Sequence, residues 1–233
     1  MADPAVGMIL AAIDTDVDNL EAWNRWYDLE HLAPNIALPG VITGRRYVAP
    51  PGLHTERVCA EADPAWGDGR AVFLTWYATA VDPREAIGAM AALRDELEAE
   101  GRMDGGGKRV VRTGDALHLT SAWSDPHRRL VADELIHVEH LGLRLVLDRA
   151  DRDAAGGPHV VASFRFESVF HPSLRAELQF LIEPASTTLN MVRRAEPVRD
   201  SIVLDAGFDV IHGLRYPFIA EIETSSLPRS IDA

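Results

Sequence analysis

The sequence predicts an α+β protein in which antiparallel sheets pack back to back. Residues 1–124 are expected to form strand, helix, strand, strand, helix and strand, in that order. Their strands carry apolar residues on both faces, so each face needs cover from another layer. The chain has 233 residues, of which 47% are hydrophobic and 25% charged. It is therefore long enough for one large domain or two compact halves.

Turn and cap residues bound each element of the first half. Asp16 or Asp18 can cap the first helix, and Pro34 marks a break or a new turn. Asp82-Pro83 opens the second helix, and Gly101 stops it. The resulting order, β-α-β-β-α-β, is the ferredoxin-like arrangement. The predicted strands are residues 7–15, 41–48 and 70–79 and a fourth within 110–123. The predicted helices follow Asp16 or Asp18 and begin at Pro83.

Element order in the second half predicts a second, degenerate ferredoxin-like unit, so the predicted domains are 1–124 and 125–233. Two such sheets, from one chain or from two, would form an α/β barrel whose interior holds a small apolar ligand. The predicted elements are a linker or short helix at 124–134, strands within 135–148, 160–170, 201–210 and 214–224, a helix or strand at 174–182, and a loose tail at 225–233.

Composition excludes several classes of protein. With 36 acidic and 23 basic side chains, the net charge of -13 argues against a nucleic-acid partner and against an anionic membrane surface. Cys59 is the single cysteine, which excludes an internal disulfide framework. No signal-peptide pattern and no run of 18 apolar residues is visible. We therefore expect a cytoplasmic protein whose partner is a small molecule.

The most informative segment is residues 23–31, where two tryptophans, a tyrosine and a histidine fall within nine positions. Asn24, Tyr27 and His31 share one helical face because they are spaced three and four apart. His31 is a candidate general acid/base, since an ordinary imidazole exchanges a proton near neutral pH. Tyr27 could donate a hydrogen bond to a substrate oxygen. Helix capping by His31 and core packing by Tyr27 are the structural alternatives.

This segment, with the residues after it, resembles the EthD-like and related dimeric α/β-barrel families. The resemblance covers residues 7–123 and implies a barrel and possible homodimer. Relatives include cofactor-free isomerases, cyclases, dehydratases and monooxygenases and some haem-binding branches, many acting on aromatic, polyketide or lactone compounds. The matching pattern is Trp26, Tyr27 and His31, then Pro39-Gly40, then Arg45, Arg46 and Tyr47.

We therefore predict a cofactor-independent isomerase, cyclase or lyase/dehydratase that moves a proton on a small aromatic or polyketide-like carbonyl compound. Two alternatives stay open: a haem-dependent or O₂-handling enzyme on the same barrel, and a non-catalytic small-molecule binding protein. No cofactor and no metal are predicted. The predicted catalytic residues are His31 and Tyr27, and the predicted substrate-binding residues are Asn24, Trp23, Trp26, Arg46 and Trp76.

Other motifs carry less weight. His137, Glu139 and His140 lack the HExxH spacing and, on a strand, would not converge on a metal. Gly105-Gly106-Gly107-Lys108 lacks the spacing of a phosphate-binding loop and follows a helix, so a flexible connection is expected. The exposed edges of ferredoxin-like sheets favour pairing between two chains.

Overall fold

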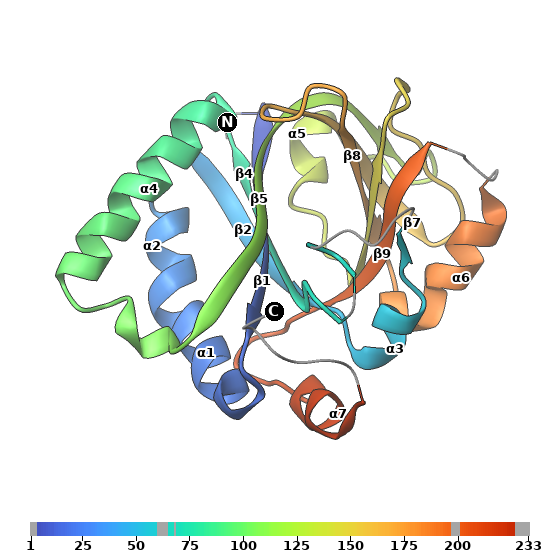
Figure 1. Cartoon of the computed structure of the whole chain (residues 1–233). Coiled ribbons are helices and arrows are strands. Elements are labelled where there is room, and N and C mark those ends of the chain that lie inside the picture. The colour runs from blue at the N-terminus through green and yellow to red at the C-terminus, as the bar shows by residue number, and fades with distance from the viewer. Residues whose placement is uncertain (1–3, 60–64, 68, 197–200, 227–233) are drawn as a thin grey trace.

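Eight strands form a closed antiparallel ring in the computed structural model, which describes residues 4–59, 65–67, 69–196 and 201–226 (Figure 1). The ring order is β2-β4-β1-β5-β7-β8-β6-β9, and β9 also pairs with β2 and with the short β3. The strands are β1 (Gly7–Thr15), β2 (Val41–Val48), β3 (Val58–Cys59), β4 (Phe73–Thr79), β5 (Arg109–Ser124), β6 (Gly142–Asp148), β7 (Val160–Ser168), β8 (Arg175–Leu181) and β9 (Ile202–Val210).

The helices α1, α2 and α4 lie on one side of the ring, and α3 and α6 lie on the other (Figure 1). A π-helical turn, η2, joins α1 to α2. The helices are α1 (Leu20–Trp26), η2 (Tyr27–His31), α2 (Leu32–Ile36), α3 (Pro51–Thr55), α4 (Pro83–Ala99), α5 (Ala132–Leu135), α6 (Ala185–Ala195) and α7 (Phe218–Thr224), with the 3-10 turns η1 (Val17–Asn19) and η3 (Asp104–Gly106).

The two halves of the ring share one strand order. Numbered within its own half, each reads 2-3-1-4: β2-β4-β1-β5 in the first and β7-β8-β6-β9 in the second. The second half keeps α6 between its third and fourth strands but has a loop, residues 149–159, where the first half has α1 and α2. The predicted pair of ferredoxin-like units, the second degenerate, is thus confirmed. The boundary between residues 124 and 125 stays a prediction.

Closure of the ring uses the sheet edges that we expected to pair between chains. β5 pairs with β7 along most of β7, and β2 pairs with β9 through Tyr47–Val210 and Val48–Asp209. Each unit therefore covers the edges of the other within one chain. The argument for a homodimer from free edges no longer holds, and the homodimer itself stays a prediction.

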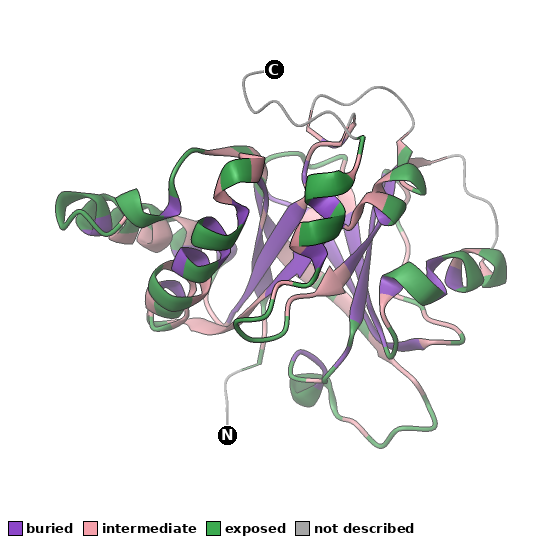
Figure 2. Ribbon diagram, turned by 90° about the horizontal axis from the view of Figure 1, so that it is seen from below, coloured by how far each residue is buried: buried purple, intermediate pink, exposed green. Residues whose placement is uncertain are grey.

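The inner face of the ring is filled with apolar side chains. Alternation along β1 and β4 sends Met8, Leu10, Leu74 and Trp76 inward. Figure 2 shows the strands as a mostly buried layer between partly exposed helices. The space predicted to hold a ligand is occupied by rings from both units: Tyr47, Trp76, Phe164, Phe166, Phe180 and Phe208, each at most 2% exposed.

The outer faces of the two units differ in chemistry. In the first unit the outer face is apolar, and α1 and α7 pack on it through Ile13 and Phe73. In the second unit, buried ion pairs take that place, because the loop and α6 leave the face without a full helical cover. Arg144 pairs with Asp205 at 2.8 Å, and Arg165 pairs with Asp148. The remaining charged members of this ionic network are Arg152, Glu177, Arg193 and Glu196.

Four second-half predictions need correction or comment. Residues 214–224 were predicted as a strand, but α7 forms because Pro217 starts it and Phe218 and Ile222 share a buried helical face. The strand predicted within 135–148 begins only at Gly142, after α5 and a turn. The ambiguous segment 174–182 contains β8. Most of the predicted tail, residues 227–233, lies outside the described residues.

Candidate functional site

Five of the seven predicted site residues lie together between the first helix and the outer face of β2 and β4. They are Trp23, Asn24, Tyr27 and His31 from α1 and η2, and Arg46 from β2. We call this group, with its contacts, the helix–sheet site. It lies on the opposite side of the sheet from the ring interior, where the ligand was predicted to bind.

The π-helical turn η2 shapes this site. The Leu32 N–H donates to the carbonyl of Tyr27, five residues back, so the helix widens at this point. Pro34, expected at a break or a new turn, lies in the first turn of α2, where a residue without a backbone N–H is tolerated. Single π-helical turns inside α-helices are frequent at functional sites. Here the turn spans Tyr27 to His31, the predicted catalytic pair.

The His31 ring lies between two aromatic rings. It stacks on Trp26 with centroids 4.9 Å apart and meets the edge of Tyr27 at 4.7 Å. Burial, with Arg109 and Arg46 nearby, lowers the pKa of His31 to about 4. The imidazole is therefore neutral at pH 7. Its Nδ1 is buried without a hydrogen-bond partner, so one ring nitrogen is unused.

Two phenols meet beside His31. The hydroxyls of Tyr27 and Tyr77 are 3.4 Å apart, and both rings are at most 4% exposed. Burial and the neighbouring Tyr27 raise the pKa of Tyr77 well above its usual value. Tyr77 thus keeps its proton and can donate it to the oxygen of Tyr27. In that arrangement the Tyr27 hydroxyl hydrogen is free to point at a ligand.

Arg46 is buried at the centre of the site. Its guanidinium donates to Asp28 Oδ1 at 2.6 Å and to Asn24 Oδ1 at 2.7 Å, and it lies 4.3 Å from the centroid of Tyr27. The other carboxylate oxygen of Asp28, Oδ2, accepts a hydrogen bond at 2.8 Å from the hydroxyl of Tyr216. Tyr216 lies two residues before α7. Through Asp28 it therefore links Arg46 to the second half of the chain.

Four buried polar atoms in the site have no hydrogen-bond partner: Trp23 Nε1, His31 Nδ1, Arg46 Nε and Thr75 Oγ1. Thr75 lies opposite Arg46 in the β2–β4 register, and Trp23 packs on Arg46 at 4.8 Å. An unsatisfied buried polar group costs about 1–3 kcal/mol, so these atoms call for a partner, which is either ordered water or a ligand. Because Trp Nε1 and Arg Nε are donors only, the missing partner must carry acceptor atoms.

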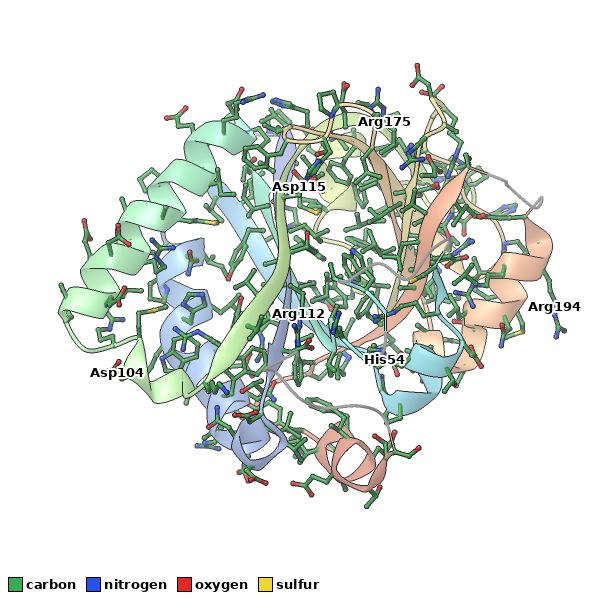
Figure 3. The ribbon with its side chains drawn as sticks, in the orientation of Figure 1. His54, Asp104, Arg112, Asp115, Arg175 and Arg194 are labelled. Atoms are coloured by element: carbon green, nitrogen blue, oxygen red, sulfur yellow. The ribbon has the colours of Figure 1, made fainter. Side chains whose placement is uncertain are left out.

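Trp26 is held as a packing residue. Its Nε1 donates to the carbonyl of Arg102 at 2.8 Å. The loop that begins at Asp104, labelled in Figure 3, lies against its ring. A Cβ on Gly106 would come within 2.5 Å of Trp26 Cε3, and one on Gly105 within 2.6 Å of Cδ1. The run of glycines therefore allows the backbone to approach the indole, a role that the sequence analysis did not assign.

Trp76 does not join the site. It projects into the ring interior, where Nε1 donates to the Tyr47 hydroxyl at 2.6 Å. That hydroxyl lies 2.7 Å from His140 Nε2, while His140 Nδ1 lies 2.8 Å from the carbonyl of Val138. A carbonyl only accepts, so Nδ1 carries the hydrogen and Nε2 accepts from Tyr47. Every polar atom in this chain of contacts is paired, as expected for a structural role.

The remaining predicted motifs are also accounted for. Glu139 pairs with Arg45 at 2.7 Å on the surface, and His140 is buried on the inner side of the ring. Across the part of the chain that the structure describes, no three His, Cys, Asp or Glu side chains gather into a possible metal site. In that same part, no helix has the length and apolar character needed to cross a bilayer.

Sequence reasoning missed four residues of the site: Asp28, Thr75, Tyr77 and Tyr216. Asp28 had a local signal, because it lies four residues after Asn24 on the same helix. Thr75 and Tyr77 were assigned correctly to the face of β4 opposite Trp76, but nothing indicated that this face meets the helix site. Tyr216 is 188 positions from its partner Asp28 and gave no local signal.

No protein-family model matches the sequence, and no curated protein matches it. Among solved structures, a protein provisionally named a chlorite dismutase matches with 11% identity over 90% of this chain and 96% of its own, at a TM-score of 0.49. A DypB variant from Rhodococcus jostii RHA1 in complex with haem has 11% identity, coverages of 90% and 94%, and a TM-score of 0.47. A provisionally named monooxygenase from Lactobacillus acidophilus NCFM has 7% identity, coverages of 89% and 93%, and a TM-score of 0.41.

The ferredoxin-like assignment of this chain rests on its own strand order, and any function rests on its own residues. The narrower expectation of an EthD-like protein stays a prediction.

Proposed function

We propose that this protein is an enzyme that binds a small aromatic or polyketide-like carbonyl compound in the helix–sheet site and transfers a proton without a cofactor. The observation that carries the proposal is the cluster of unpaired buried polar atoms around Tyr27, His31 and Arg46. The aromatic character of the ligand is supported by the rings of Trp23 and Tyr27 at the site. The polyketide-like class comes from the resemblance of the helix motif alone.

The proposed chemistry assigns one task to each group. Tyr27 donates a hydrogen bond to the substrate carbonyl oxygen, and His31 Nδ1 accepts the proton from the adjacent carbon. The resulting enolate oxygen carries negative charge, which the guanidinium groups of Arg46 and Arg109 stabilise. Return of the proton to another carbon gives isomerisation, and loss of a leaving group gives elimination. All these steps use groups that the site contains.

A haem-dependent function is the second candidate from the sequence, and the packed site does not fit it. His31 has the unused imidazole nitrogen that iron would need, but its ring is stacked on Trp26 and edge-on to Tyr27. The ring interior is filled by aromatic side chains, and the outer face of the second unit is filled by ion pairs. We therefore derive no step through haem.

Exchange of α-protons for deuterium tests the proposal without knowledge of the natural substrate. A panel of aryl ketones and aryl β-diketones in D₂O is followed by proton NMR with the intact protein. We expect catalysed exchange for at least one compound, about 10²-fold slower in His31→Ala and about 10-fold slower in Tyr27→Phe. His137→Ala is the matched control, because His137 is exposed and outside the site.

The pH profile adds a second readout. Since the pKa of His31 is about 4, the unprotonated base is present throughout pH 5–8, and kcat/KM should fall only as the pH approaches 4. A fall centred near pH 6.5, or equal exchange rates in wild type and His31→Ala, would remove His31 from the role of base. A Soret band after incubation with haem would instead favour the haem-dependent alternative.

A further inference from the structure

A hollow lies at the far end of β5 from Arg109, where β5 ends and β7 begins. Its volume is about 340 Å³, within the range of small-molecule sites. The residues that line it come from the turn after β5, the turn before β7 and the end of β8. They include Trp123, Asp125, Arg128, Pro158, His159 and Ile182.

One wall of the hollow is apolar and fixed in position. Trp123 is partly exposed there, whereas the other four tryptophans are at most 4% exposed. A Cβ on Gly156 would lie 2.1 Å from Trp123 Cζ3, so the absence of a side chain allows the loop to rest on the indole. Pro126, Pro158 and Ile182 extend this wall. A flat ring suits such a surface because aromatic and proline faces bury much area with little loss of conformational freedom.

The polar groups around the hollow are mainly donors. Asp125 is already engaged, because Oδ1 accepts from the His127 N–H at 2.9 Å and Oδ2 lies 3.6 Å from Arg128 Nε. The Arg128 guanidinium forms this long ion pair with Asp125 and, within the described residues, makes no hydrogen bond. His159 has a positive φ of 69°, a conformation that histidine enters more readily than most residues. Its Nδ1 lies 3.7 Å from Glu183 Oε2, which leaves Nε2 as the nitrogen for a ligand.

We propose that this hollow binds a small aromatic carboxylate. The ring of the ligand lies against Trp123 and Pro158, and its carboxylate accepts two hydrogen bonds from the Arg128 guanidinium, with His127 or His159 as a further donor. The protein carries a net charge of -13, so it does not attract anions in general. Binding of a carboxylate at this place must therefore come from local groups. The proposal is independent of the helix–sheet site.

Titration with 2-naphthoate tests the proposal, with the five indole N–H signals of ¹⁵N-labelled intact protein as the readout. We expect the Trp123 signal, assigned with Trp123→Phe, to shift and saturate at millimolar or lower concentration while the other four stay fixed. Arg128→Gln should weaken binding at least 10-fold. The neutral isostere 2-naphthylmethanol should bind wild type at least 10-fold more weakly than naphthoate does.

Two further variants make the outcome decisive. His159→Gly tolerates the positive φ without strain, so it should fold at least as well as wild type and bind naphthoate several-fold more weakly. Arg129→Gln, which changes the neighbouring exposed arginine, should leave binding unchanged. A shift that does not saturate, a shift of several indoles together, or equal affinity for naphthoate and the alcohol would overturn the assignment.

Discussion

At the scale of single residues, two adjacent arginines show how burial decides the value of an ion pair. The Arg46 side chain is 2% exposed and holds Asp28 and Asn24, whereas Arg45 pairs with Glu139, whose side chain is 81% exposed. The sequence showed only that the two must face opposite ways. It could not show which one faces the helix, because that depends on the register of β2 with β4.

Substitution of these arginines should have unequal effects. Arg46→Met is expected to destabilise the fold by about 3–5 kcal/mol, because it leaves Asp28 without its buried partner. Arg45→Met should cost less than about 1 kcal/mol, since its pair is solvated. Urea unfolding of both variants measures the difference. Similar losses in the two would contradict the assigned burial, and Asp28→Asn in the Arg46→Met background should recover part of the loss.

Buried neutral histidines should make stability depend on pH. Burial lowers the pKa of His140 to about 4 and, with Arg57 nearby, that of His54 to about 3. Unfolded histidines titrate near pH 6.5, so the unfolded chain binds more protons between pH 6.5 and 4. Stability is therefore complete above pH 6.5 and falls as the pH drops through this window.

His140→Gln should reduce this dependence. We expect the loss of unfolding free energy between pH 7 and pH 5 to be smaller in the variant by roughly 1–2 kcal/mol, measured by urea titration at each pH. The exposed His137→Ala serves as control and should follow wild type. Parallel curves for wild type and His140→Gln would show that His140 is not the group responsible.

At the scale of elements, contacts between segments explain features that local patterns did not. The first half was predicted element by element because its caps, turns and alternation agree with one another. The π-helical turn was not predicted. It lies directly before the helix that contains Pro34, and it includes the buried Tyr27 and the stacked His31. The helix α6 was missed because its apolar positions, Leu189 and Val192 among them, stand among polar neighbours.

The contact between η3 and Trp26 gives a prediction at this scale. Gly106→Ala should displace the indole and destabilise the fold by about 1–3 kcal/mol, because its Cβ would meet the ring at 2.5 Å. Gly88→Ala is the matched control: nothing lies within 4 Å of its Cβ in α4, and it should stabilise by about 0.5–1 kcal/mol. Urea unfolding with Trp fluorescence follows both. An innocuous Gly106→Ala would show that the loop does not rest on Trp26.

At the scale of the whole molecule, the ring makes the two units depend on each other. The inner face of the first unit carries Met8, Leu74 and Trp76, and the second unit covers them. The sequence predicted two units but left open whether one chain or two would join them. The sequence also could not show that ion pairs hold the outer face of the second unit. Arg144 and Asp205, for example, pair although they are 61 positions apart in the chain.

A fragment of residues 1–124 should therefore not persist as a monomer. Its uncovered inner face is apolar, so we expect it to pair with itself or to aggregate, and to become soluble in a 1:1 complex when residues 125–233 are expressed with it. Size-exclusion chromatography with light scattering measures these masses. A monomeric fragment with cooperative unfolding would show that the first unit does not need the second.

The ionic network also bears on behaviour on heating. The penalty for removing charges from water falls as temperature rises, whereas apolar burial gains little more. The face held by Arg144, Asp205 and Arg193 should thus keep its amide protection at temperatures where the Trp23 and Phe218 side has begun to open. Hydrogen exchange at increasing temperature would then show that amide protection is lost first on the side of the molecule that carries the candidate catalytic residues.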